Sequence, residues 1–303
     1  MKIAVLGPKG TFSDKAYLEY NKFIKAGGSK GYEPVYCQTI DDVFKAVCSD
    51  DSLDVTDECE FGIVPIENTL DGYVQRTLDL LLEKNVRIID ENIVPVQFSV
   101  IGNVSSVEDI TKLYVQFKAN GQCRQFINSL SGVTISATDS NMESYYKIEG
   151  EIGAAAIVPK HIADDENDRF VIENVTDADK NHTRFVIFKK GALKENEMLT
   201  GKLDIAGECD CASDVTQSNR ARIPVYIMPD ADRPGILFEI LQSFYENQIN
   251  LISIMSRPTK HKMGTYNFYI EIDGEISRLP VIMDTLQKVS TYNKIKILGI
   301  YNE

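Results

Sequence analysis

The chain of 303 residues is too long for a single hydrophobic core, so we expect two or three domains. Its composition, 43% hydrophobic and 25% charged, is that of an ordinary globular protein, and its net charge of −13 argues against nucleic acid as a partner, because phosphate binding needs a basic face. No apolar run approaches 18 residues and no secretory signal pattern follows Met1, which predicts a cytoplasmic protein without a membrane partner.

The first ninety residues alternate between strand and helix patterns. A short apolar strand pattern at 3–6 leads through a glycine-rich turn into a helix pattern that Ser13 or Asp14 can cap. Further strand patterns occur at 35–37 and 61–66, and helix patterns at 40–47 and 74–82. This rhythm predicts a largely parallel α/β sheet.

A second α/β stretch begins near Ile93 and predicts a second lobe. A helix is expected at 122–130, and the chain returns to a strand at 184–188 that belongs to the first lobe or bridges both. Two α/β lobes with a cleft between them fit this pattern. The strand patterns of the second lobe lie at 99–101, 113–115, 133–135 and 154–158.

Residues 191–221 lose periodicity and are expected to form a linker. Helix patterns follow at 236–244 and 282–289, among strand patterns at 223–228, 249–254, 266–272 and 295–300. The order βαββαβ predicts a separate ferredoxin-like domain at the C-terminus.

Thr183 and Arg184 stand side by side at the entrance of the strand at 184–188. Arg can hold a carboxylate with two parallel N–H donors, and a neighbouring hydroxyl can assist proton transfer. Strict strand alternation sends the two side chains to opposite faces, so they converge on one ligand only if the strand is irregular at Thr183, with Phe185 pointing into the core. The alternative is a surface ion pair between Arg184 and Asp177 or Asp179.

Two further segments follow strands. In Gly7-Pro8-Lys9-Gly10-Thr11-Phe12-Ser13 the glycines permit close approach to a ligand, the amides of the next helix attract anions, and Thr11 and Ser13 add hydroxyls. Asn68 and Thr69 follow the strand at 61–66, at the kind of position where α/β sheets place ligand groups. Taken alone, each segment is explained at least as well by a turn that caps a helix.

The cysteines and histidines predict neither a metal site nor a cofactor. The six cysteines are scattered and none lies in a zinc-type paired spacing with histidines, which favours free thiols. Cys209 and Cys211 could bind a soft metal, but a solvated loop is the favoured interpretation of that segment. Only three histidines exist, at His161, His182 and His261. We therefore expect an enzyme of this sequence to work without a histidine base, a metal or a cofactor.

In their joint order these segments resemble the prephenate dehydratases over nearly the whole chain. The segment 7–13 resembles the family's opening motif, and 64–69 resembles its Val-Pro-Ile-Glu-Asn-Ser motif with Thr69 in the serine's place. Thr183-Arg184-Phe185 matches its Thr-Arg-Phe motif. The segments 235–238 (Gly-Ile-Leu-Phe) and 255–258 (Met-Ser-Arg-Pro) resemble the two phenylalanine-binding motifs of its ACT regulatory domain.

The resemblance implies a bilobal, periplasmic-binding-protein-like catalytic region at 1–190, with one lobe of 1–93 and 172–190 and another of 94–171. The linker at 191–221 then leads to an ACT domain at 222–303. It also implies the decarboxylating dehydration of prephenate to phenylpyruvate in L-phenylalanine biosynthesis, allosteric regulation by phenylalanine or another amino acid, and a homodimer or homotetramer.

The resemblance also assigns roles to residues. It makes Thr183 the catalytic hydroxyl, Arg184 the cation that binds a substrate carboxylate, and Phe185 the anchor of the strand. It adds two groups, the residues that line the substrate site, Thr11, Ser13, Asn68 and Thr69, and those that bind the effector, Gly235, Ile236, Leu237, Ser256, Arg257 and Pro258.

Three departures from the family pattern leave alternatives open. Residues 115–118 stand where many relatives carry Ser-His-Pro-Gln, and 138–142 replace a segment rich in Ser, Thr and Ala, so the contribution of the second lobe is open. Met255 replaces the usual glutamate of the regulatory motif, which leaves the effector open. The alternative functions are an arogenate dehydratase and a catalytically silent sensor of amino acids or small anions.

Overall fold

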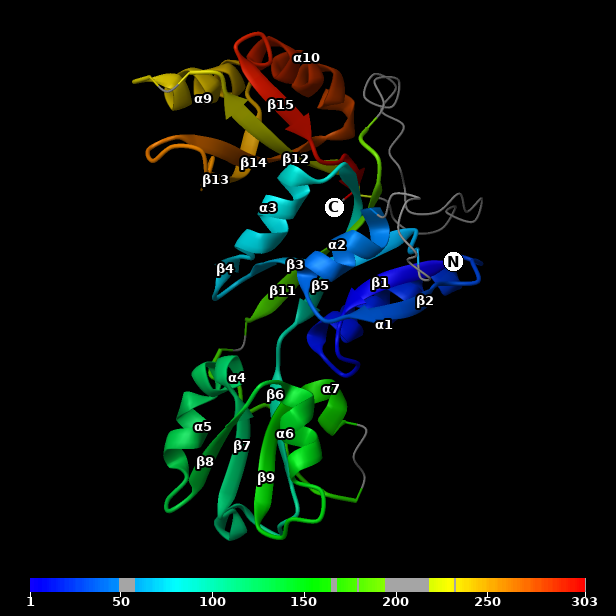
Figure 1. The fold of residues 1–303 in the computed structure, drawn as a ribbon, viewed down its shortest axis with the longest axis vertical. Coiled ribbons are helices and arrows are strands. Elements are labelled where there is room, and N and C mark those ends of the chain that lie inside the picture. The colour runs from blue at the N-terminus through cyan, green and yellow to red at the C-terminus, as the bar shows by residue number, and fades with distance from the viewer. Residues whose placement is uncertain (49–57, 165–167, 179, 194–217, 232, 303) are drawn as a thin grey trace.

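A computed structural model describes residues 1–48, 58–164, 168–178, 180–193, 218–231 and 233–302. They form three β-sheets with flanking helices, and Figure 1 shows the first lobe between the second lobe and the C-terminal domain. The predicted fold class, two α/β lobes followed by a ferredoxin-like unit, is confirmed. Most of the predicted linker lies outside the described residues. Within the described ranges, no helix is long and apolar enough to cross a membrane.

The sheet of the first lobe has the strand order β2-β1-β3-β11-β5, with β4 beside β3. β1, β2 and β3 are parallel, whereas β11 runs antiparallel to its neighbours β3 and β5. The start of β11 therefore shares one edge with the ends of β1, β3 and β5. The bounds are Lys2–Leu6 (β1), Glu33–Cys37 (β2), Phe61–Asn68 (β3), Gly72–Tyr73 (β4), Val86–Pro95 (β5), His182–Lys190 (β11), Phe12–Ala26 (α1), Ile40–Cys48 (α2) and Gln75–Glu83 (α3).

The sheet of the second lobe has the order β10-β6-β9-β7-β8. β7 is parallel to β8 and β9, and β6 is antiparallel to β9, so the ends of β7, β8 and β9 share an edge with the start of β6. The helix predicted at 122–130 is present as α5, and α4, which was not predicted, precedes it. The backbone leaves the helical conformation between the two, at Cys123 (φ −127°, ψ 32°). The bounds are Phe98–Gly102 (β6), Lys112–Gln116 (β7), Thr134–Thr138 (β8), Ala154–Pro159 (β9), Phe170–Ile172 (β10), Val107–Asp109 (η1), Phe117–Gln122 (α4), Arg124–Ser129 (α5), Asn141–Lys147 (α6) and Lys160–Ala163 (α7).

Two segments cross between the lobes, one from β5 to β6 and one from β10 to β11 (Figure 1). Val96 N–H donates to the carbonyl of Asn181 and Val175 N–H to that of Phe98, each at 2.8 Å, so the two crossings are joined side by side. Because the chain crosses at these strand ends, the two shared edges face each other.

The C-terminal domain has the order β13-β14-β12-β15, with β16 beside β12, and its elements follow the predicted βαββαβ order. Apolar residues on one face of its sheet form a core with α9 and α10. The bounds are Arg220–Pro229 (β12), Asn250–Pro258 (β13), Tyr266–Glu275 (β14), Asn293–Ile297 (β15), Tyr301–Asn302 (β16), Ile236–Glu246 (α9), Ile276–Arg278 (η2) and Leu279–Val289 (α10).

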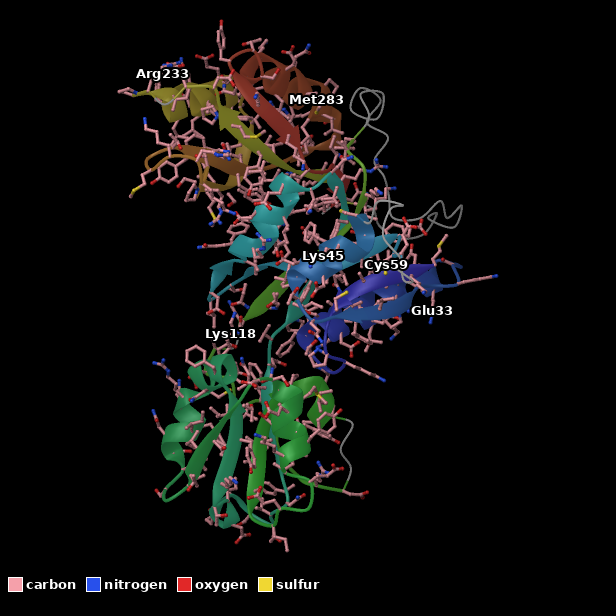
Figure 2. All side chains as sticks on the ribbon, viewed as in Figure 1. Glu33, Lys45, Cys59, Lys118, Arg233 and Met283 are labelled. Carbon is pink, nitrogen blue, oxygen red and sulfur yellow. The ribbon has the colours of Figure 1, made fainter. Side chains whose placement is uncertain are left out.

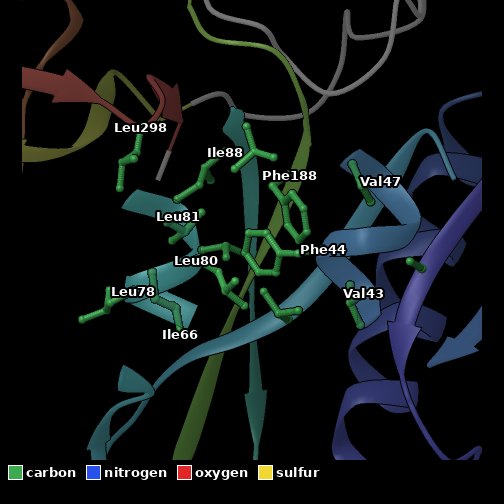
Figure 3. Close-up of a cluster of buried hydrophobic side chains, with 14 of the residues drawn as sticks. Val43, Phe44, Val47, Ile66, Leu78, Leu80, Leu81, Ile88, Phe188 and Leu298 are labelled. Carbon is green, nitrogen blue, oxygen red and sulfur yellow. The ribbon is translucent and has the colours of Figure 1, made fainter. Parts of the chain in front are cut away.

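The other face of that sheet shares a core with the first lobe. Figure 3 shows Phe44 beside Phe188, whose ring centroids lie 4.3 Å apart, and Leu298 of the C-terminal domain at the edge of the same cluster. The hydroxyl of Tyr226 on β12 donates to the carbonyl of Leu78 on α3 at 3.0 Å. The C-terminal domain is therefore fastened to the first lobe by apolar packing as well as by hydrogen bonds.

Candidate functional site

The candidate site lies where the facing edges of the two sheets meet. The first lobe contributes the loop 7–11 after β1, the end of β3 and the start of β11. The second lobe contributes the ends of β7 and β8, each followed by the start of a helix, and Figure 2 labels Lys118 on this side of that lobe. Polar groups from both lobes thus share one region between two domains, a common location for ligand sites.

Thr183 and Asn68 form the central pair of this region. They are partners in the β11–β3 ladder, and the Nδ2 amide of Asn68 donates to the Oγ1 atom of Thr183 at 2.9 Å. The Oδ1 atom of Asn68 accepts the N–H groups of Leu70 and Asp71, each at 3.0 Å, which fixes the orientation of the amide. In the part of the chain that the structure describes, no protein group accepts the O–H proton of Thr183, so this hydroxyl can donate to a ligand.

Two residues that the sequence analysis did not select complete this polar cluster. Asn181 is 1% exposed and accepts from Asn68 Nδ2 at 2.9 Å. Its own amide donates at 3.0 Å to Oε1 of Gln122, at the end of α4 in the second lobe. The sequence signal that could have found them was their position: Asn181 stands two residues before Thr183, and Gln122 stands directly before Cys123. The chain Gln122–Asn181–Asn68–Thr183 links the two lobes.

Thr69 closes the end of the ladder. Its hydroxyl donates to the carbonyl of His182 at 3.1 Å and accepts the His182 N–H at 3.1 Å, while its own N–H donates to that carbonyl at 2.9 Å. Thr69 therefore holds the start of β11 against the end of β3, directly beside the Thr183–Asn68 pair.

A β-bulge in β3 decides which face each of these residues occupies. The ladder pairs Thr183 with Asn68 and Arg184 with Glu67. The next pair joins Phe185 to Pro65, so Ile66 has no partner on β11. An extra residue in one strand shifts the alternation of its side chains. The Thr183–Asn68 pair therefore lies on the face that α1 covers, and the Arg184–Glu67 pair lies on the opposite face.

Thr11 and Ser13 lie at the start of α1, as predicted. Thr11 is the N-cap: its Oγ1 accepts the N–H of Asp14 at 3.3 Å and donates to the carbonyl of Pro8 at 2.9 Å. Ser13 is 8% exposed. The turn caps the helix, but through Thr11 and not through Ser13 or Asp14 as predicted, because the helix begins at Phe12. No hydrogen bond among the described residues joins Thr11 or Ser13 to Thr183.

The loop at 7–10 contacts the second lobe through Met142. Gly10 has φ +87°, and a Cβ atom there would lie 2.5 Å from the sulfur of Met142, so only glycine permits this approach. A pocket of about 410 Å³ lies beside the contact. Its lining comes from both lobes and consists of Pro8, Lys9, Ser140, Met142, Glu143, Tyr146 and Lys147. The segment 138–142 thus meets the opening motif although it departs from the family pattern.

Arg184 does not face this polar cluster. Its side chain is 6% exposed and donates to the carboxylates of Glu67 at 2.9 Å, Glu91 at 3.2 Å and Glu271 at 2.7 Å. Glu271 belongs to β14 of the C-terminal domain. Although burial opposes the charge, the carboxylate of Glu271 raises the pKa of Arg184 above its ordinary value.

This position is not the one expected of a substrate-binding cation, the role that the sequence analysis predicts for Arg184. Strand alternation continues through Thr183, Arg184 and Phe185: Phe185 is 1% exposed in the core on the α1 side, and Arg184 points the other way. The surface pair considered as an alternative does not occur with Asp177, which accepts two backbone N–H groups at the start of α5. Asp179 lies outside the described residues.

Lys118 places a cation beside the polar cluster. Its Nζ lies 3.4 Å from Oδ2 of Asp71 across the two lobes, and the side chains are 70% and 49% exposed. Asp71 follows the Asn68 turn directly, and Lys118 lies in the segment at 115–118 that departs from the family pattern. An exposed ion pair of this kind is weak, so Lys118 can exchange its partner for a ligand at little cost.

The residues predicted to bind an effector lie at one end of the C-terminal sheet. Gly235, at φ 86°, precedes Ile236 and Leu237 at the start of α9, and β13 ends with the segment 256–258 at the same end, because β12 and β13 both run antiparallel to β14. Arg257 is 8% exposed, and its Nη2 lies 2.7 Å from Oδ1 of Asp79 on α3. In this chain Arg257 thus fastens β13 to the first lobe.

The described residues contain no cluster of three His, Cys, Asp or Glu side chains that could hold a metal ion. None of the described cysteines, Cys37, Cys48, Cys59 and Cys123, takes part in a disulfide, and Cys209 and Cys211 lie outside the described residues. Burial raises the pKa of the Cys123 thiol to about 12, so the thiol beside Gln122 is not a ready nucleophile. The chemistry available at the site is therefore that of hydroxyls, amides and Lys118.

Comparison with known proteins gives one family for the two lobes and another for the C-terminal domain. The model of the family described as prephenate dehydratase matches residues 3–192, and that of the ACT domain matches residues 231–290. The prephenate dehydratase of Methanocaldococcus jannaschii is 31% identical over 298 residues, which cover 97% of this chain and 95% of the relative.

Two further relatives extend over the whole chain. The bifunctional chorismate mutase/prephenate dehydratase of Aquifex aeolicus is 30% identical over 304 residues, which cover 99% of this chain and 73% of that protein. The crystal structure of a prephenate dehydratase from Arthrobacter aurescens in complex with L-Phe superposes with a TM-score of 0.76 at 26% identity, covering 100% of this chain and 90% of that one.

Proposed function

Because the chain belongs to the prephenate dehydratase family, we propose that it removes carbon dioxide and water from prephenate and releases phenylpyruvate, a step of L-phenylalanine biosynthesis. We assign the reaction to the region between the lobes. The observation that carries this assignment is the hydrogen bond of 2.9 Å from Asn68 to Thr183, which leaves the threonine O–H free to donate.

Thr183 is the proposed proton donor. Prephenate loses its ring carboxylate as carbon dioxide, and the electron pair of the broken C–C bond moves through the ring and expels the hydroxyl at the opposite ring carbon. That oxygen accepts a proton and leaves as water. Thr183 donates to it, solvent restores the proton, and the Asn68 amide stabilises the negative charge that develops on Oγ1. Formation of the aromatic ring drives the step, so a strong nucleophile is unnecessary.

The two carboxylates of prephenate need positive potential that Arg184, bound to three glutamates, cannot supply. We assign this role to Lys118 and to the amides at the start of α1, where Thr11 and Ser13 lie. The first turn of a 15-residue helix attracts anions through its unpaired N–H groups. Together with Asn68 and Thr69, these groups form the proposed substrate site.

The direct test is to add the purified chain to prephenate and to follow phenylpyruvate, with arogenate assayed in parallel. Turnover of prephenate well above the spontaneous rate is expected. A folded protein that forms no phenylpyruvate contradicts the proposal, and turnover of arogenate alone assigns the amino substrate instead. Binding of L-phenylalanine without turnover of either substrate supports a sensor.

The proposal also covers the effector of the ACT domain, the oligomeric state and the location in the cell. We assign L-phenylalanine as the effector of the ACT domain, because the related Arthrobacter aurescens protein was crystallised in complex with L-Phe and the chain keeps Gly235 and the segment 256–258. A homodimer or homotetramer and a cytoplasmic location are also proposed, and sedimentation analysis and cell fractionation test them.

A further inference from the structure

We propose that Arg184 is a positioning residue through which the ACT sheet holds the catalytic pair Thr183 and Asn68 in place, an inference that rests on the proposed function. Arg184 does not touch the substrate in this account. It acts on the far side of the strands that carry the two catalytic side chains.

The first observation is the back-to-back arrangement of two pairs. Thr183 and Asn68 are partners in the β11–β3 ladder, and Arg184 and Glu67 are the next partners. The bulge at Ile66 turns the first pair toward the proposed site and the second toward the C-terminal domain. Only one peptide unit in each strand separates a catalytic residue from an ion-paired one. A shift of the Arg184–Glu67 pair therefore moves Thr183 and Asn68.

The second observation is a buried interdomain charge cluster, formed by Arg184, Arg222, Glu67, Glu91 and Glu271. Arg184 binds the three carboxylates, and Glu91 also accepts from Arg222 at 3.1 Å. The side chains of Arg184, Glu91 and Glu271 are 6%, 7% and 2% exposed. Because water cannot replace a lost partner at the buried Glu91 and Glu271, these two carboxylates restrain the guanidinium strongly. The Glu67 side chain, at 37% exposed, lies at the rim of the cluster and restrains it less.

The third observation is that the ACT sheet supplies its share of the cluster from the middle of the sheet. Glu271 lies on β14 and Arg222 on β12, adjacent strands in the order β13-β14-β12-β15. Glu271 also accepts from the hydroxyl of Tyr269, and Glu91 accepts from that of Tyr301 at 3.1 Å. The carboxylate that holds Arg184 is thus fixed by its own domain, so the position of the ACT sheet sets the position of Arg184.

The test compares two isosteric substitutions in the full chain. Glu271→Gln removes the charge that the ACT domain presents to Arg184. Asp79→Asn is the matched control, because Asp79 also pairs with a buried arginine of the ACT domain, Arg257, but lies on α3 and not on the catalytic ladder. Circular dichroism verifies that both variants are folded.

Steady-state kinetics on prephenate give the first readout. For Glu271→Gln we expect kcat to fall by about tenfold or more with a nearly unchanged KM, since small misplacements of catalytic groups are costly. Asp79→Asn should keep the kcat of the parent chain. Arg184→Lys should also lower kcat more than it raises KM. A rise in KM alone in that variant would restore the substrate-binding role and overturn the proposal.

Hydrogen exchange gives a readout that does not depend on activity. The N–H of Thr69 donates to the carbonyl of His182 at 2.9 Å, so it reports on the ladder end that carries the catalytic pair. Glu271→Gln should speed exchange in peptides covering 66–70 and 181–185, and Asp79→Asn should not. Equal exchange rates of these peptides in the parent chain, Glu271→Gln and Asp79→Asn contradict the coupling between the ACT sheet and the catalytic pair. Absence of turnover in the parent chain contradicts the proposed function alone.

Discussion

At the scale of single residues, Thr183 brings one hydroxyl to the proposed chemistry. Thr183→Ala removes the donor to the departing oxygen, so we expect kcat to fall by roughly 10² or more, the usual scale for a proton-transfer group. Thr183→Ser keeps the hydroxyl and should retain most of the activity. Steady-state kinetics on prephenate measure both variants, and near-normal turnover in the alanine variant would remove Thr183 from its assigned role.

Lys118 is the residue whose substitution should act on substrate binding. Lys118→Met removes the exposed cation beside the Asn68 turn, so KM for prephenate should rise about tenfold or less while kcat changes little, because an exposed charge pair contributes about 1 kcal/mol. Asp71→Asn frees Lys118 and should leave KM unchanged or lower it. Kinetics at low and high salt check the assignment, and a KM for Lys118→Met equal to that of the parent chain at low salt rejects it.

Asp90 on β5 makes the stability of the chain depend on pH. Burial raises the pKa of this carboxyl to about 7, from an ordinary value near 4. Between these pH values the folded chain binds a proton that the unfolded chain has lost, so the contribution of Asp90 to stability falls as pH rises from about 4 to about 7 and is absent above that range. Asp90→Asn should therefore gain stability over the parent chain above pH 7 and lose that advantage near pH 4, as urea unfolding at several pH values measures. A pH-independent difference contradicts this assignment.

At the scale of elements, the packing of β3 against β11 leaves no room for a side chain at Gly62. A Cβ atom there would lie 2.5 Å from the ring of Phe188, which stacks on Phe44. Gly62→Ala should therefore lower the free energy of unfolding by about 1–3 kcal/mol, the usual cost of overpacking a core. Gly121→Ala, in α4 with nothing within 4 Å, is the control and should be neutral or slightly stabilising. Urea unfolding measures the free energy of unfolding of each protein, and equal values for Gly62→Ala and the parent chain contradict the expected clash.

The same elements show what the sequence can and cannot predict. Apolar periodicity predicted most of the strands and helices, because each element buries one regular face or stripe. It did not reveal the bulge at Ile66 or the break at Cys123, since an extra residue or a local turn leaves the apolar pattern unchanged. Strand alternation indicated that Arg184 points away from Thr183, but no local pattern contains its partners, such as Glu271, which is 87 residues away.

At the scale of the whole molecule, three units meet at two adjacent residues of β11. Thr183 joins the polar cluster that continues through Asn68 and Asn181 into the second lobe, whereas Arg184 joins the charge cluster that continues into the ACT sheet. Neither side chain alone connects all three units. Their peptide bond does, so the strand start that carries the proposed chemistry is also where movements of the second lobe and of the ACT domain converge.

This convergence leads to a prediction for regulation. If L-phenylalanine acts by shifting the ACT sheet, Glu271→Gln should bind it with an unchanged affinity in calorimetry but lose most of the change in kcat/KM between zero and saturating L-phenylalanine. The coupling free energy, and not the binding of the effector, is what the Glu271–Arg184 contact supplies. Asp79→Asn separates this route from the Arg257 contact and should keep the response. If Glu271→Gln keeps the full response of kcat/KM to L-phenylalanine and Asp79→Asn loses it, the coupling is assigned instead to the contact between β13 and α3.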